Sequence, residues 1–350
     1  MAIFDGQLKD NEIFGSLFNM VISQQVFADN IAGLSSALVD KARVDGGLYG
    51  DTKLYYASDA LKSADWGNDA EAENLLALHR PPEPECQAIR LDKFRQICVT
   101  VDSYMTKRAW KDEGAFASFN AVVTAWLGDT KKIYDTTLYN TYIGTVETNV
   151  GKQQVTVDVD ANGRTTGENI AEAIANLLDD VSDVSRDYND YGNIRAFRKE
   201  DIEIVWNSKY LNEVKKVDLP SIFHSEQLMD TFKGDSLNKK YFGTVKTTAG
   251  NAPNPNTTIR SLIEKDYGSV HVFPGELIPN GAAYTKDTVY EEKSDIICKV
   301  MVKLPPYMSA FEVGTSFFNP KSLTETKYLT FGHNTLEYLQ NYPLITVKAI

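Results

Sequence analysis

The sequence predicts a mixed α+β protein built around one long amphipathic helix. Between Lys111 and Ile143, apolar side chains recur at steps of three and four residues, so they fall on one helical face. Strand and helix patterns alternate through residues 153–214, and further strand patterns follow between residues 296 and 347. Helices and strands combined in this order favour the α+β class.

The N-terminal segment, residues 1–45, has the pattern of a helical arm. Its apolar residues between Ile13 and Val39 recur at helical spacing. Three glycines, Gly46, Gly47 and Gly50, then mark a turn or hinge. We expect extended structure to begin there.

Residues 46–101 are predicted to form an extended two-stranded loop. Strand patterns at Thr52–Tyr56 and Cys86–Val101 flank a polar tip of ~30 residues, and loops of this length are usually functional. Such a tip is too polar to be buried in its own domain, so we infer that it lies on a neighbouring subunit. A surface insertion without a partner is the alternative. The expected intersubunit contacts are Lys53, Tyr55, Tyr56, Lys62, Trp66, Arg80, Arg90 and Phe94.

The long helix would serve as a strut across an elongated body. At 1.5 Å rise per residue it would be roughly 45 Å long, which is more than a compact domain needs. The side chains expected to pack along its apolar face are Phe116, Phe119, Val123, Trp126, Ile133 and Leu138.

A sheet with helices against it is predicted after the long helix. Residues 153–158 alternate as a half-buried strand, and residues 167–184 carry an apolar helical stripe. A strand pattern at Asp201–Trp206 precedes a helix that runs from Ser208 through Val214. Later strand patterns lie at residues 269–273, 296–303, 307–318, 327–331 and 344–347. A chain whose last pattern is a strand is expected to be tied into a sheet.

Composition and charge exclude several classes of protein. The 350 residues are 43% hydrophobic and 24% charged, which allows a sizeable core. A net charge of -12 argues against binding phosphates over a broad surface. Cys86, Cys98 and Cys298 are an odd count without a close pair, so reduced thiols are expected. Without a secretion signal or an apolar run of about 18 residues, no membrane contact is predicted.

No catalytic residue, metal site or cofactor is predicted. The sharpest motif, Asp158-Val159-Asp160-Ala161-Asn162-Gly163, has the oxygen ligands and glycine that begin a calcium loop. Its twelfth position is Asn169 where the loop requires glutamate, so a turn before a helix is the preferred interpretation. The four histidines are scattered singly, and the sequence has no nucleophile elbow, phosphate-binding loop or dinucleotide fingerprint.

The order and length of these segments resemble the major capsid proteins of tailed bacteriophages, which have the Hong Kong 97-type fold. In that family a helical arm, an extended loop and a spine helix precede a sheet-and-helix domain that returns to a C-terminal strand. The resemblance covers nearly the whole chain and rests on architecture. The stretches that carry it are Asn11–Phe14, Ser23–Phe27, Gly46–Val101, Lys111–Ile143, Gly167–Val184 and Asp201–Leu211.

The resemblance implies a division of the chain. Residues 1–45 would form the N-terminal arm, 46–101 the extended loop and 102–160 the peripheral domain with the spine helix and a strand. Residues 161–295 would form the axial domain, and residues 296–350 would supply strands that return to the peripheral domain.

The resemblance also implies a structural protein and not an enzyme. Copies would assemble into pentamers and hexamers of an icosahedral head that encloses the double-stranded DNA genome without sequence-specific binding. The implied partners are further copies of the chain, a separate scaffolding protein, a portal and decoration proteins. The implied location is the virion capsid, assembled in the cytoplasm of a bacterial host.

Two other functions remain open at this point. An encapsulin-like nanocompartment shell would share the fold and hold a protein cargo, although encapsulins tend to be shorter and lack so large an extended loop. A soluble hydrolase or binding protein would need site residues that converge only in space. The sequence carries no activated nucleophile, base or metal set that would mark one.

Overall fold

The computed structural model describes residues 37–45, 52–57, 59–61, 63, 78, 80–102, 113–145, 154–159, 163–188, 192–216, 234–247, 288–334 and 344–350. Most of the expected N-terminal arm, the loop residues Lys62 and Trp66 and the strand pattern at residues 269–273 lie outside the described residues. The described residues form helices and sheets together, which confirms the α+β class.

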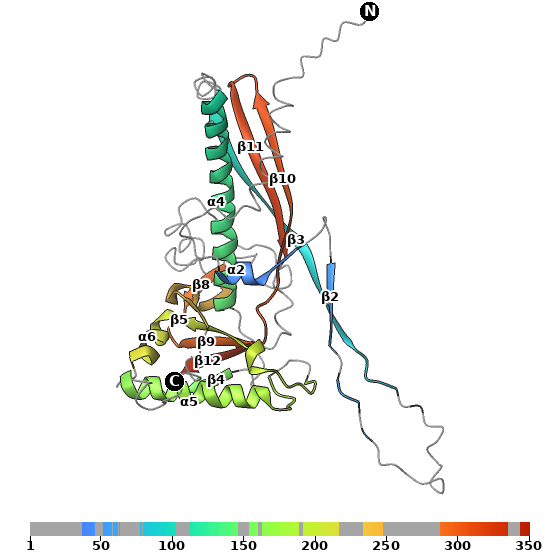
Figure 1. The fold of residues 1–350 in the computed structure, drawn as a ribbon, viewed down its shortest axis with the longest axis vertical. Coiled ribbons are helices and arrows are strands. Elements are labelled where there is room, and N and C mark those ends of the chain that lie inside the picture. Colours follow the sequence, from blue (N-terminus) through green and yellow to red (C-terminus); the bar gives the residue numbers. More distant parts are fainter. Residues whose placement is uncertain are drawn as a thin grey trace, which may run out of the picture.

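The predicted long helix is confirmed as α4 (Glu113–Thr145), which stands upright in Figure 1 beside a long hairpin. Its 33 residues span about 50 Å. The buried stripe along it advances by steps of four and three residues, the helical period. This stripe is formed by Val123, Leu127, Lys131, Tyr134, Leu138 and Tyr142.

The first sheet packs one face against α4. Its strand order is β1-β10-β11-β3-β2, with β10 and β11 forming the long hairpin. Leu329 of β11 lies in one core cluster with Leu138 of α4, while Thr100 and Thr326 on the opposite face hydrogen-bond at 3.0 Å. One apolar face and one polar face is the usual arrangement of an antiparallel sheet. The strands are β1 (Arg43–Asp45), β2 (Thr52–Ala57), β3 (Glu85–Asp102), β10 (Tyr307–Asn319) and β11 (Thr324–Asn334).

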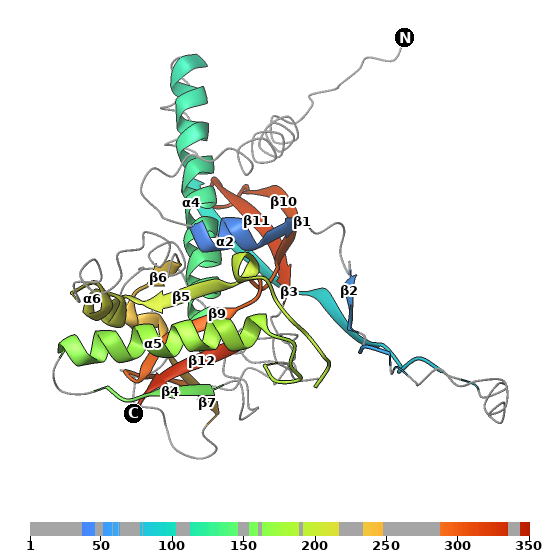
Figure 2. The ribbon, with the colours of Figure 1, turned by 60° about the horizontal axis from the view of Figure 1, so that its bottom comes forward.

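The second sheet has the order β4-β12-β9-β5-β6, and α5 lies against one of its faces (Figure 2). Ile170 and Ile174 of α5 and Trp206 of β5 are fully buried in the cluster that this packing forms. The elements are β4 (Gln154–Val157), α5 (Gly163–Ser182), β5 (Glu203–Asn207), α6 (Ser208–Lys216), β6 (Asp235–Leu237), β9 (Ile296–Met301) and β12 (Leu344–Ala349).

The remaining described elements are short. They are α2 (Ala37–Ala42), η3 (Lys199–Asp201), η4 (Lys239–Tyr241) and the antiparallel pair β7 (Gly243–Thr247) and β8 (Thr288–Glu292). Of these, α2 and η4 both contact α4.

Both faces of the second sheet are buried. Ile204 and Trp206 of β5 face the cluster around α5, whereas Val205 between them belongs to the cluster around α4. Adjacent residues point to opposite faces of a strand, so β5 divides its side chains between the two cores. The second sheet therefore joins α4 on one side to α5 on the other.

The strand pairing of the second sheet bears on the expected division of the chain, which stays a prediction. Residues 296–350 were expected to return to the body of the long helix, but β9 and β12 pair with each other in the second sheet. Likewise β4, expected with the long helix, pairs with β12. A short apolar run fits a buried position in either sheet, and its own residues do not specify the partner strand.

A close backbone contact lies at the C-terminal end of α4. A Cβ atom built on Gly144 would lie 2.0 Å from the carbonyl oxygen of Tyr241 in η4. Only glycine permits this approach of helix to backbone. A Cβ atom built on Gly128 in the same helix would meet nothing within 4 Å, so glycine is not required for packing there.

We predict opposite effects of alanine at these two glycines. Gly144→Ala should lower the free energy of unfolding by about 1–3 kcal/mol because the backbone of η4 must move. Gly128→Ala should raise it by about 0.5–1 kcal/mol because alanine favours a helix interior. Urea denaturation of single subunits measures both, and equal effects of the two substitutions would contradict the contact.

Candidate assembly surfaces

The clearest candidate site for subunit contact is a two-stranded ribbon that leaves the first sheet. Strand β3 changes partner along its length: residues from Leu91 to Asp102 pair with β11, and residues from Glu85 to Arg90 pair with β2. The β2–β3 part projects away from the body in both Figure 1 and Figure 2. Among the described residues no third strand pairs with it. Ile89 at the base of the ribbon is buried in the core around α4. A two-stranded ribbon without further packing is marginally stable in water, so the part beyond Ile89 needs another surface.

Exposed leucines mark this ribbon and the loop beyond it. Leu54 on β2 is 52% exposed, and Leu61 and Leu78 in the loop are 73% and 83% exposed. The cations expected to make contacts, Arg80 and Arg90, are exposed as well. Apolar and cationic side chains held away from the body are suited to binding a partner.

One expected contact residue of the loop packs inside its own chain. Phe94 pairs with Gly332 in the first sheet and lies partly buried against the core cluster around α4. Its expected contact with a neighbouring subunit stays a prediction. The strand pattern of β3 is continuous, so the sequence does not show that the ribbon ends near Leu91. Lys53, Tyr55 and Tyr56 lie on β2, and their side chains are outside the described part of the structure.

The second candidate surface is on α4. Val123 and Leu138 are buried and Ile133 packs against the core, but Trp126 is 57% exposed. It does not pack on the core of its own chain because the buried stripe passes through Leu127, and consecutive residues are about 100° apart around a helix. With Val122, which is 47% exposed, Trp126 forms an apolar pair on the open face. Phe116 and Phe119 lie in α4, with side chains outside the described part of the structure.

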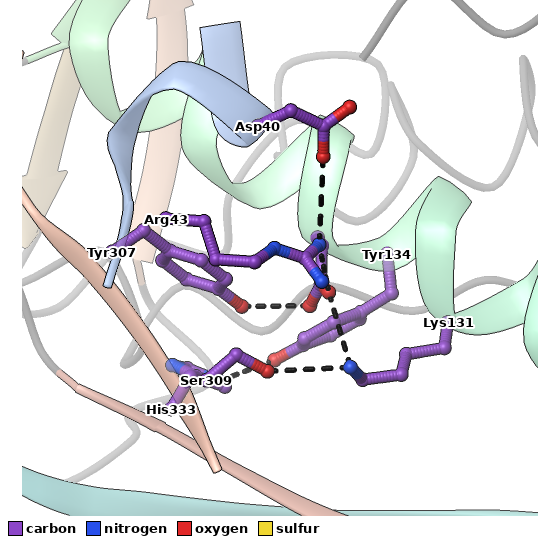
Figure 3. Close-up of polar contacts among 8 residues, drawn as sticks. Asp40, Arg43, Lys131, Tyr134, Tyr307, Ser309 and His333 are labelled. Carbon is purple, nitrogen blue, oxygen red and sulfur yellow. Dashed lines mark hydrogen bonds and ion pairs between the residues drawn. The ribbon is translucent and has the colours of Figure 1, made fainter. Parts of the chain in front are cut away.

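A buried polar cluster lies between α4 and the first sheet, and Figure 3 shows its contacts. The hydroxyl of Tyr307 on β10 donates to Asp135 Oδ1 at 2.7 Å. The other carboxylate oxygen lies 3.6 Å from Lys131 Nζ and 3.7 Å from Nη2 of Arg43 on β1. Lys131 also donates to Ser309 at 3.2 Å. One carboxylate thus joins three segments far apart in the sequence.

A second set of hydrogen bonds extends the cluster to β11. His333 Nδ1 contacts the carbonyl of Asn334 at 3.1 Å, and a carbonyl only accepts, so Nδ1 carries the proton. His333 Nε2 then accepts from the Tyr134 hydroxyl at 2.8 Å. Burial, followed by the charge of Asp135, raises the pKa of Tyr307, which keeps its hydroxyl a donor.

The centre of the cluster is closed to solvent, whereas Arg43 at its edge is 32% exposed. The side chains of Lys131 and Asp135 are 4% and 2% exposed. Because Arg43 belongs to β1, which pairs in parallel with β10, the cluster attaches the end of the N-terminal segment to α4. Sequence analysis missed these residues. The available signal was a lysine and an aspartate four residues apart, beside the apolar stripe of a long helix.

Within the described residues, no three metal-ligand side chains come together. At the calcium-like motif, the Asn169 amide donates to the backbone carbonyl of Asp158 at 3.1 Å. Cys98 is exposed and Cys298 buried, and burial raises the pKa of the Cys298 thiol. His79, His224 and His271 lie outside the described residues. In the part of the chain that is described, none of the helices has the length and apolar character needed to cross a membrane.

Comparison with known proteins relates the chain to phage structures. No protein-family model matches the sequence, and no curated protein matches it. The structure is similar to a chain of the capsid structure of Staphylococcus phage Andhra, with a TM-score of 0.60 and 10% identity, covering 93% of this chain and 86% of that chain. It is also similar to a chain in the structure of the head fiber and inner core protein gp22 of native bacteriophage P68. The TM-score is 0.60 and the identity 12%, and the match covers 87% of this chain and 83% of that chain.

At this level of identity the likeness concerns the fold, and a fold alone does not establish a function. The expected Hong Kong 97-type fold is confirmed. The long helix, the projecting ribbon and the two sheets described above are its parts in this chain.

We predict that Asp135→Asn strongly destabilises the subunit. The substitution leaves Lys131 buried without its counter-charge, and breaking a buried pair in this way costs about 3–5 kcal/mol. Urea denaturation of single subunits measures the change. Asp129→Asn, on a partly exposed position of α4, is the control and should change stability by no more than about 0.5 kcal/mol. Equal effects of the two would show that the cluster does not hold the fold.

Proposed function

We propose that this protein is a phage major capsid protein. Copies would form pentamers and hexamers that close into an icosahedral head around double-stranded DNA. The observation that carries this proposal is the β2–β3 ribbon, which projects from a body of the Hong Kong 97-type fold and exposes leucines. A neighbouring copy of the chain would supply the burial that the ribbon lacks.

The assignment of segments to domains rests on the same proposal. We assign α4 and the first sheet to the peripheral domain, with residues 1–45 as the N-terminal arm. The second sheet with α5 and α6 would be the axial domain, now including β4, β9 and β12. The loop contacts on a neighbour would come from Lys53, Tyr55, Tyr56, Lys62, Trp66, Arg80 and Arg90 together with Leu54, Leu61 and Leu78.

The charge of the chain is compatible with a shell around DNA. A net charge of -12 would let the lining enclose the genome without sequence-specific binding and without holding it at every subunit. No catalytic activity, metal or cofactor is part of the proposal. Its further partners are a separate scaffolding protein, a portal and decoration proteins, and its location is the virion capsid, assembled in the bacterial host cytoplasm.

We predict that the full chain forms closed shells or capsomers in negative-stain electron microscopy, and that deletion of Ala60–Glu85 abolishes them. The deleted subunit should remain folded because none of the described residues of the tip belongs to either core. Circular dichroism checks this point, and global unfolding of the deletion variant would contradict the role between subunits.

The same experiment separates the alternatives. Packaged DNA in particles made with a scaffold supports a capsid, whereas a protein cargo would favour a nanocompartment. Full-length protein that stays monomeric under every assembly condition would contradict the proposed function.

We also predict that Trp126 is an anchor between subunits. Exposed aromatic side chains of this kind often supply roughly 2 kcal/mol or more to an interface when truncated to alanine. Trp126→Ala should therefore reduce the yield of assembled particles while the melting temperature of the single subunit stays unchanged. Ala125→Ser, the exposed neighbouring position, is the control and should assemble normally. Normal assembly of Trp126→Ala would exclude this contact.

A further inference from the structure

A single aspartate connects the projecting ribbon to the segment that follows α5 in the same chain. Asp59 lies two residues beyond the end of β2, at the end of the ribbon far from the first sheet. Its Oδ2 accepts a hydrogen bond from Arg186 Nη1 at 2.9 Å, and its Oδ1 accepts from the backbone amide of Ile194 at 2.9 Å. Oδ1 also accepts from the amide of Ala60 at 2.8 Å. Both carboxylate oxygens are therefore in use.

The segment that receives Asp59 follows α5 and is well tied to it. Ser185 and Arg195 exchange two backbone hydrogen bonds, and the amide of Phe197 donates to the Val181 carbonyl in α5 at 3.2 Å. Phe197 also packs against the core cluster around α5. Ile194 is adjacent to these hydrogen bonds, so the direction of its amide N–H is set by the backbone of the segment after α5.

The Arg186 side chain is oriented for the contact. The same Nη1 atom that binds Asp59 also donates to the carbonyl of Gly192 at 2.7 Å. Gly192 has a positive φ of 63°, a conformation that glycine adopts without strain. The guanidinium is thereby held between its own segment and the ribbon.

The carboxylate form of Asp59 matches these partners. The Ile194 amide, the Arg186 guanidinium and the Ala60 amide together lower the pKa of the Asp59 carboxyl to about 2. The side chain is thus an anion at neutral pH, and the contact is lost as the pH falls through about 2.

The ribbon is consequently held at two points. At one end β3 continues into the first sheet, and at the other end Asp59 binds the segment after α5. Without the second point, a ribbon joined only through β3 could swing about the place where it leaves the sheet. We propose that Asp59 is a positioning residue that sets the direction in which the loop of residues 60–84 leaves the subunit.

The consequence for assembly rests on the proposed function. A loop that already points in its bound direction loses less conformational freedom when a second copy binds it. Because the contact consists of a few partly exposed hydrogen bonds, it can also be broken without unfolding the core around α4 or the core around α5. Its effect is therefore on the direction of the loop and not on the stability of the fold.

The test follows the direction of the loop in single subunits by measuring the distance between two spin labels with pulsed electron paramagnetic resonance. Spin labels are placed on Leu61→Cys and Ile350→Cys, both strongly exposed, with Cys86 and Cys98 changed to serine. Cys298 is buried and remains. Labelled chains kept below the assembly concentration should give one narrow distance.

Asp59→Ala removes both contacts with the segment after α5 and should replace that single distance by a broad distribution. Arg186→Gln leaves the bond to the Ile194 amide and should broaden the distance less, and the double variant should be no broader than Asp59→Ala alone. Ser63→Ala, an exposed position in the same loop, should leave the narrow distance unchanged. An unchanged narrow distance in Asp59→Ala would overturn the proposal, and so would a double variant broader than both single variants.

The outcome is independent of shell formation. If the wild-type chain never assembles but the spin distance responds to Asp59→Ala, the proposed function fails and the positioning role stands. If shells form and the spin distance does not respond to Asp59→Ala, the positioning role fails and the proposed function stands.

Discussion

The structure depends on the burial of one stripe of α4 against the first sheet. This stripe belongs to a single core that also takes in side chains from α2, β3, β10, β11 and one face of the second sheet. Apolar burial provides most of the free energy, at about 25 cal/mol per Å² removed from water. The cluster of Arg43, Lys131, Asp135 and Tyr307 then ties three segments together, because the Asp135 carboxylate accepts a hydrogen bond from Tyr307 and forms ion pairs with Lys131 and Arg43.

The second sheet extends this constraint to the rest of the chain. Its strands bury alternate side chains in two cores, so α5 packs on one face of the sheet and α4 on the other. The close approach of Gly144 to Tyr241 fixes the end of α4 at the same junction. The β2–β3 ribbon therefore projects from a body in which α4 and α5 pack on opposite faces of the second sheet.

The candidate contacts show where sequence patterns are informative. The ribbon could be predicted because a polar stretch with Arg80-Pro81-Pro82-Glu83-Pro84 between two strand patterns has no core of its own to join. The patterns did not show that Phe94 lies in the first sheet or that Trp126 is exposed on α4, because a strand or helix pattern does not state where an element enters or leaves the core. The anchor at Asp59 could not be predicted, since its partners Arg186 and Ile194 lie more than a hundred residues away.

The sequence by itself determined the class of the fold, the long helix, the positions of most strands and the existence of the extended loop. These are local properties, because the period of the apolar residues and the turn residues between them act within a few residues along the chain. Only the tertiary structure decided that β4, β9 and β12 join the second sheet, that Lys131 and Asp135 are buried together, and that Asp59 reaches the segment after α5. Each of these depends on pairing between distant residues, which a one-dimensional pattern does not encode.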